Sequence, residues 1–189
     1  MALTRLGPIN NIINGTLGVA NGGTGLASGT TGQFLKFTGS TVIGTGEAGG
    51  GKVNQVVFSQ SADASYIGTN SASYVTTGTS VTITPSATNS KIQLNVYTGR
   101  SYTGGAAAAT EINIYRSTSS SYLGTGDSMA TLKSSANVTH GSHNIQFIDN
   151  SHNTTSAITY TPYFKSSSSH GYFAHEDSVW QIQATEILA

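Results

Sequence analysis

Apolar and polar residues alternate with a period of two along most of the chain beyond residue 52. In residues 91–98, KIQLNVYT, the side chains of Ile92, Leu94 and Val96 fall on one face of an extended chain. Such alternation predicts strands that bury one face. Eight strands are predicted in this way, with two shorter ones at the end of the list: residues 53–60, 80–84, 91–98, 110–116, 128–134, 143–149, 157–165, 178–188, 65–69 and 73–77.

Polar turns rich in Ser, Thr and Asn separate the predicted strands, and no segment shows a convincing helical period. The short run of alanines at residues 106–109 is predicted to join two strands. Eight to ten short strands at this spacing are typical of an antiparallel β-sandwich or jelly roll. The sequence therefore predicts an all-β domain over residues 52–189, a normal size for one domain.

The last predicted strand, residues 178–188, lies at the very end of the sequence. Its residues Trp180, Ile182 and Ala184 share one face, and Gln181 and Gln183 lie on the other. Terminal residues fray unless a sheet holds them. We therefore expect a central strand whose second face is available to another subunit.

The first 51 residues have a different pattern, because small apolar islands alternate with glycines and Asn-containing turns. Most of the 23 glycines lie in this segment. It cannot close a core of its own. A flexible linker is one interpretation, but linkers usually lack repeated apolar islands. We expect residues 1–51 to form an extended arm that buries its islands on another surface, with EAGGGK at residues 47–52 as the hinge.

Charge is scarce, with charged residues at 8% and a formal net charge of zero. Hydroxyls and amides must therefore keep the protein soluble. Nucleic acid and anionic lipid are not expected as partners, because no patch of Lys and Arg can be assembled to neutralise phosphates. The chain has no cysteine, which excludes disulfides and thiolate metal sites. No signal peptide and no apolar run of about 20 residues for membrane insertion is found.

The stretch GTLGVANGGTG, residues 15–25, resembles a motif that recurs in bacteriophage tail-fibre and related virion proteins. The residues that carry the assembly role in this resemblance are Leu17, Val19, Asn21, Gly22, Gly23 and Gly25. The resemblance implies an extended, usually trimeric connector, followed over residues 29–45 by a short hairpin. The strand-rich remainder is similar to trimeric jelly-roll heads of virion fibres, in type like tumour-necrosis-factor and complement globular heads.

The resemblance implies a homotrimeric structural protein of a phage virion, assembled in the host cytoplasm. Residues 1–51 would anchor it to other virion proteins, since only about fourteen residues precede the motif, and the head would meet a glycan or protein of the host surface. A capsid decoration or head-fibre protein fits the same pattern. A carbohydrate-binding lectin or a depolymerase is a further alternative.

Catalytic chemistry finds little support in the sequence. GVANGGTG at residues 18–25 lacks the Gly-Lys-Ser/Thr ending of a phosphate loop. No nucleophile elbow is found, and the adjacent acids Glu176 and Asp177 would point to opposite faces of a strand. The protein is therefore predicted not to be an enzyme and to hold no cofactor.

The histidines offer weak metal candidates. His140 and His143 in HGSH could gather around a trimer axis, and HGYFAHED offers His170, His175, Glu176 and Asp177 as a second group. The alternative is that these residues are polar loop tips.

Tyrosine is unusually frequent, with nine tyrosines against six phenylalanines. Tyr with Ser, Gly and Asn is the mixture that adaptable binding surfaces use. Tyr102, Tyr122 and Tyr172 fall in predicted loops, as does His170, and these four residues are the candidates for surface recognition of a glycan or a subunit. The alternative for a strand tyrosine is a half-buried structural position.

Overall fold

The computed structural model describes residues 34–37, 43–46, 52–61, 66–124, 128–135, 137–167, 170–176 and 178–188. The chain divides into two units, Met1–Gly50 and Gly51–Ala189, and each is described by itself. In the first unit, strand β1 (Phe34–Phe37) pairs antiparallel with β2 (Ile43–Gly46), as the resemblance implies for this segment. The motif with Leu17, Val19, Asn21, Gly22, Gly23 and Gly25 lies outside the described residues, so the extended arm stays a prediction.

The second unit is built from short strands. They are β3 (Val53–Gln60), β4 (Ile67–Thr69), β5 (Val75–Thr76), β6 (Val81–Ile83), β7 (Lys91–Tyr97), β8 (Ser101–Gly104), β9 (Ala109–Arg116), β10 (Ser121–Tyr122), β11 (Ala130–Lys133), β12 (Val138–Gly141), β13 (Asn144–Asp149), β14 (Ile158–Ser166), β15 (Gly171–Ala174) and β16 (Gln181–Ile187). All pairings among the described strands are antiparallel, and the described residues contain no helix. The predicted all-β class is confirmed.

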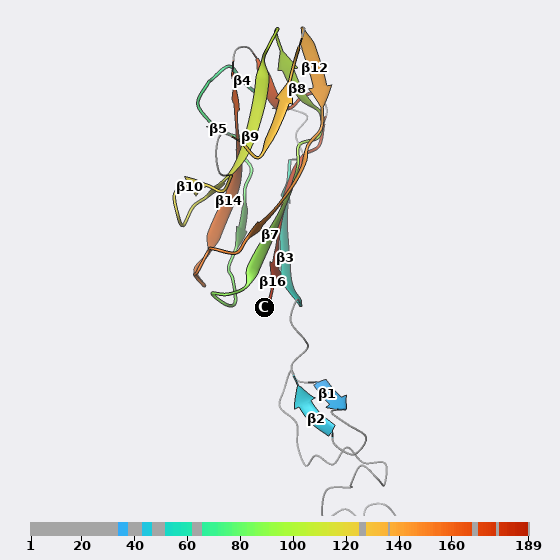
Figure 1. Cartoon of the computed structure of the whole chain (residues 1–189), viewed down its shortest axis with the longest axis vertical. Helices are drawn as coiled ribbons and strands as arrows, with labels where there is room; N and C mark the ends of the chain where they lie inside the picture. The colour runs from blue at the N-terminus through green and yellow to red at the C-terminus, as the bar shows by residue number, and fades with distance from the viewer. Residues whose placement is uncertain are drawn as a thin grey trace, which may run out of the picture. The chain divides into compact units, whose positions relative to one another are not determined.

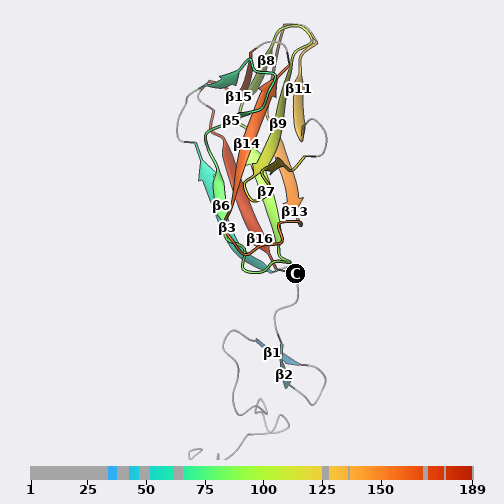
Figure 2. The same ribbon diagram turned by 90° about the vertical axis from the view of Figure 1, so that its left-hand side faces the viewer.

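Two sheets form the sandwich (Figures 1 and 2). The first sheet has the order β13-β7-β16-β3. In the second, β14 lies beside β9 at the centre, β5 and β6 share the position beside β14, and β10 and β11 share the position beside β9. Strands β4, β8, β12 and β15 form a separate sheet, which is described below. When β5 with β6 and β10 with β11 are each counted as one strand, the sandwich has eight strand positions along the chain. Their order is one–eight–three–six in the first sheet and two–seven–four–five in the second. This alternation of strands between two antiparallel sheets is the jelly-roll arrangement.

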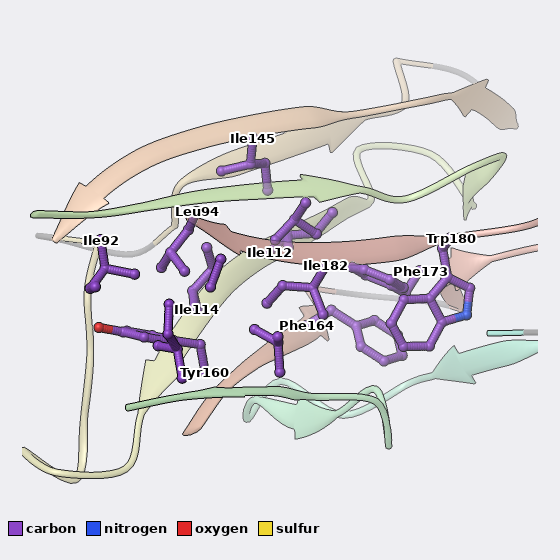
Figure 3. Packing of buried hydrophobic residues seen from close by; sticks show 14 of the residues in the cluster. Ile92, Leu94, Ile112, Ile114, Ile145, Tyr160, Phe164, Phe173, Trp180 and Ile182 are labelled. Carbon is purple, nitrogen blue, oxygen red and sulfur yellow. The ribbon is translucent and has the colours of Figure 1, made fainter. Parts of the chain in front are cut away.

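The core lies between the inner faces of the two sheets (Figure 3). Leu94 and Ile182 of the first sheet and Ile114 and Phe164 of the second are fully buried, and burying each such side chain contributes about 1.5–3 kcal/mol. Strand β16 lies between β7 and β3. Its residues Ile182 and Ala184, and Trp180 directly before it, are buried as predicted. The central position of the last strand is therefore confirmed.

Two buried carboxylates tie the layers and loops together. Glu186 of β16 accepts hydrogen bonds from Asn54 Nδ2 at 2.8 Å and Gln55 Nε2 at 2.7 Å, and from the backbone N–H of Ser86 at 2.7 Å. Asp149 of β13 lies against two residues of the second sheet and is described below. A buried charge is tolerated when donors surround it, as here.

Each predicted strand is found, but four short strands were not predicted: β8, β10, β12 and β15. As a result, Tyr102, Tyr122 and Tyr172 lie on strands and not in the loops that the sequence predicted. The physical reason is length. Strands of two to four residues rich in Gly and Ser are too short to show a period of two.

Candidate functional site

Four connections of the jelly roll each contribute one short strand to a third sheet. Its order is β12-β8-β15-β4, and we call it the connection sheet. Along the chain, β4 precedes β5, β8 joins β7 to β9, β12 precedes β13, and β15 joins β14 to β16. The connection sheet lies at the end of the sandwich opposite the C-terminus (Figures 1 and 2). Lys52 lies at the C-terminal end, because its carbonyl accepts a hydrogen bond from Leu188 N–H at 2.9 Å.

The inner face of the connection sheet is held by the core. Phe173 of β15 is fully buried, and its ring lies edge-on to Trp180 at 5.1 Å and 5.9 Å from Phe164. Ser101 of β8 donates its hydroxyl hydrogen to the Phe173 carbonyl at 3.1 Å. Since side chains alternate along a strand, the neighbours Tyr102 and Tyr172 must face outward.

The outer face gathers three tyrosines and three histidines, which we call the Tyr/His face: Tyr66, Tyr102, His140, His170, Tyr172 and His175. The pairing places His140 opposite Tyr102, and Tyr102 opposite Tyr172. Tyr102 stacks on His175 with 4.9 Å between ring centroids and 10° between ring planes. Tyr172 makes edge contacts with Tyr102 at 5.3 Å and Tyr66 at 5.7 Å. The rings therefore support one another as a continuous aromatic surface.

Two glycines leave room for the rings of Tyr172 and Tyr102. A Cβ atom on Gly68, opposite Tyr172, would come within 2.4 Å of the Tyr172 ring. A Cβ atom on Gly104 would come within 2.7 Å of the Tyr102 hydroxyl. Real Cβ atoms do not approach so closely, so any larger residue at either position would displace the ring. The glycines thus belong to the construction of the face.

The charged side chains beside His175 compensate one another. Burial lowers the pKa of His175 below its ordinary value; the Glu176 carboxylate opposes this shift and the Arg100 guanidinium adds to it. The ring is therefore neutral at pH 7. Arg100 Nη1 is ion-paired with Glu176 Oε2, so its positive charge is compensated locally.

A shallow hollow of about 330 Å³ adjoins the face and shares His140 with it. It is lined by Tyr97, Gly99, Arg100, His140, Gly141 and Ser142. Its lining combines the Tyr97 ring with the hydrogen-bonding side chains of Arg100, His140 and Ser142. The face and hollow together form the candidate binding surface.

The residues predicted for recognition divide between two places. Tyr102, His170 and Tyr172 come together on the Tyr/His face, where the rings of His170 and Tyr172 are 6.3 Å apart. Tyr122 lies elsewhere, in a cluster on the outer face of the second sheet, 4.6 Å from Tyr74. That cluster also holds Tyr115 and Tyr163. Sequence reasoning did not assign Tyr66, His140 and His175 to this surface, since no local pattern links them to Tyr102.

His140 and His143, the pair predicted as metal ligands, differ in solvent exposure. His140 is exposed on the Tyr/His face, whereas His143 is half-buried and burial lowers its pKa. No group of three or more His, Cys, Asp or Glu residues that could hold a metal ion is found in the described part of the chain. A shared metal on a trimer axis stays a hypothesis. The same described residues include no helix with the length and apolar character needed to cross a bilayer.

Comparison with known proteins adds a distant likeness. No protein-family model matches the sequence, and neither does any curated protein. Two similar solved structures are those of the T13 viral particle and the VP2 subviral particle of infectious bursal disease virus, each 10% identical, with TM-scores of 0.40 and 0.38. Each match covers 82% of this chain but 43% and 46% of the viral chains, respectively, so this chain spans under half of their length. At this similarity the comparison carries no functional argument.

Proposed function

We propose that the protein is a structural protein of a bacteriophage particle, a short homotrimeric fibre or spike whose jelly-roll domain meets the host surface. The observation that carries the proposal is that the chain enters the domain at one end and the Tyr/His face lies at the other. The chain enters it at Lys52, beside the C-terminal Leu188, and the Tyr/His face lies at the opposite end. A domain attached at one end can present its other end outward.

The N-terminal segment supports an anchoring role. The motif with Leu17 and Val19 resembles fibre connectors, and its Asn-Gly turns suit a chain that follows another surface. In this proposal, residues 1–51 bury their apolar islands against other virion proteins.

The outer face of β3 supports the homotrimer. Phe58 is 70% exposed, Val56 51% and Val53 55%. Their pairing partners place all three on the outward side of the edge strand beside β16, and contiguous exposed apolar residues mark interaction surfaces. A neighbouring subunit would cover them.

The described carboxylates favour a structural role over hydrolysis. Glu111 is paired with Lys165 at 3.1 Å, Glu176 with Arg100 and Asp149 with Arg116, while amide and hydroxyl donors surround Glu186. A glycosidase needs two carboxyl groups facing a common substrate. This arrangement supports the proposal that the protein is not an enzyme.

The test is incorporation into particles. Virions assembled with the full chain should contain the protein, and virions assembled with residues 52–189 should lack it. Immunogold labelling then distinguishes a tail fibre from a capsid decoration or head-fibre protein, the alternative that the same observations allow. Unchanged incorporation without residues 1–51 would contradict the anchoring role, and a full chain absent from particles would overturn the virion assignment. A free lectin would keep its ligand binding without the arm.

A further inference from the structure

We propose that the Tyr/His face and its hollow bind a neutral hexopyranose unit, in the form of a terminal sugar of a cell-surface glycan. The inference rests on the proposed function for the biological source of the sugar, but the binding chemistry follows from the face itself.

The aromatic rings of the Tyr/His face provide the apolar surface on which a sugar would pack. One face of a pyranose ring presents C–H groups, and these pack on the faces of aromatic rings while the sugar hydroxyls point sideways. Gly68 leaves room for the Tyr172 ring and Gly104 for the Tyr102 ring, so neither ring is pushed away from the sheet by a side chain at these positions. An aromatic ring with a polar tip serves such a ligand well, since its body packs and its hydroxyl bonds.

The hollow provides the hydrogen bonds. Ser142 and His140 line it, together with the Arg100 guanidinium and the exposed Tyr97. Its volume of about 330 Å³ lies at the lower end of the range of small-ligand sites, which suits one sugar unit and leaves the remainder of a glycan in solvent.

Charge balance selects a neutral sugar over an acidic one. The Arg100 charge is compensated by Glu176, and His175 is neutral at pH 7. A uronic or sialic acid would bring a carboxylate next to Glu176 without an uncompensated cation to receive it.

The rings of the face are held in place before a ligand binds. Tyr102 is held between His175, His140 and Tyr172, with centroid distances of 4.9, 5.1 and 5.3 Å. Rings that are already fixed lose little entropy when a ligand binds.

The test uses the full chain and NMR titration with neutral methyl glycosides of glucose, galactose, mannose and N-acetylglucosamine. At least one should shift the ring resonances of Tyr102 and Tyr172. Y172A removes a stacking ring, and G68V displaces that ring without removing it, so both should weaken binding by about tenfold or more. Y163A, in the tyrosine cluster of the second sheet, is the matched control and should bind normally. Thermal melting followed by circular dichroism identifies any variant that has lost its fold.

Three outcomes would overturn the inference: no glycoside shifts these resonances, Y172A and G68V both bind like the wild type while folded, or methyl glucuronide binds more tightly than the neutral sugars. Shifts caused by a proline-rich peptide and not by sugars would assign the face to a protein partner instead. Failure of sugar binding leaves particle incorporation unaffected, so it is distinguishable from failure of the proposed function.

Discussion

Arg116 of β9 places Nη1 2.8 Å from both carboxylate oxygens of Asp149 on β13, across the interior of the sandwich. Tyr160 of β14 adds a hydrogen bond to the same carboxylate at 2.7 Å. One carboxylate of the first sheet is therefore bound by two strands of the second. Burial alone would raise the pKa of Asp149, but the hydrogen bonds from Arg116 and Tyr160 lower it.

Replacing Asp149 by alanine should destabilise the domain by about 3–5 kcal/mol, because Arg116 and the Tyr160 hydroxyl lose their shared partner. Urea unfolding measures this difference. The control is Arg100→Gln, whose ion pair is about half exposed and should contribute about 0–1 kcal/mol. Equal effects of the two variants would contradict the structural role of Asp149.

The lowered pKa of Glu186 predicts that the domain loses stability in acid. Burial raises its pKa, but hydrogen bonds from Gln55, Asn54 and the Ser86 backbone outweigh that effect and bring the pKa to about 2, below the ordinary 4.5. The unfolded chain therefore binds more protons between these values, and stability falls as the pH drops from about 4.5 to about 2. Comparing unfolding of the wild type and Glu186→Gln across this range checks the prediction, since the variant should lack this component.

The lowered pKa values of His175 and His143 predict a separate loss of stability at milder pH. Burial lowers the pKa of His175 and of His143 below the ordinary 6.5. Since the folded state binds fewer protons than the unfolded state, stability should fall as the pH drops from about 6.5 toward the folded-state pKa values. NMR titration of the ring protons measures these values directly. The acidic and basic groups around His175 are Glu176, Arg100 and His140; H175N should flatten its part of the pH dependence.

Trp180 is the single tryptophan of the chain and is 1% exposed. Its fluorescence should therefore be blue-shifted in the folded protein and report global unfolding. Trp180→Ala should cost about 3–5 kcal/mol, because it leaves a cavity beside Phe173. Trp180→Phe is the control and should cost less, since Nε1 has no hydrogen-bond partner in the described structure. Unfolding of both variants is followed by circular dichroism. Similar losses of unfolding free energy for the two variants would contradict this packing role.

Phe58 tests the proposed trimer. Phe58→Glu places a charge on the exposed apolar strip of β3 and should yield monomers, measured by size-exclusion chromatography with light scattering. Ile148→Glu is the matched control, because Ile148 is 52% exposed on β13 at the other edge of the same sheet. It should leave the trimer intact. A wild type that is monomeric at micromolar concentration would contradict the proposal.

The sequence by itself determined most of the strands, but not the short strands β8, β10, β12 and β15, and it determined the face that the longer strands bury. Alternation is a local property, since consecutive side chains of an extended chain point to opposite sides. The buried face of residues 91–97 and the central strand with Ile182 could therefore be predicted without knowing any partner strand. The tyrosine-rich composition likewise led to Tyr102, His170 and Tyr172 as recognition candidates, and these three residues lie together on the Tyr/His face.

Only the tertiary structure decided which residues share that surface. Tyr66, Tyr102, His140 and Tyr172 come from four different connections, and their neighbourhood depends on how the jelly roll brings those connections to one end. The same topology places Tyr122 on the second sheet. The tertiary structure also gave Gly68 its role. This glycine has no local signal, because the ring that needs the space, Tyr172, belongs to a strand about a hundred residues away.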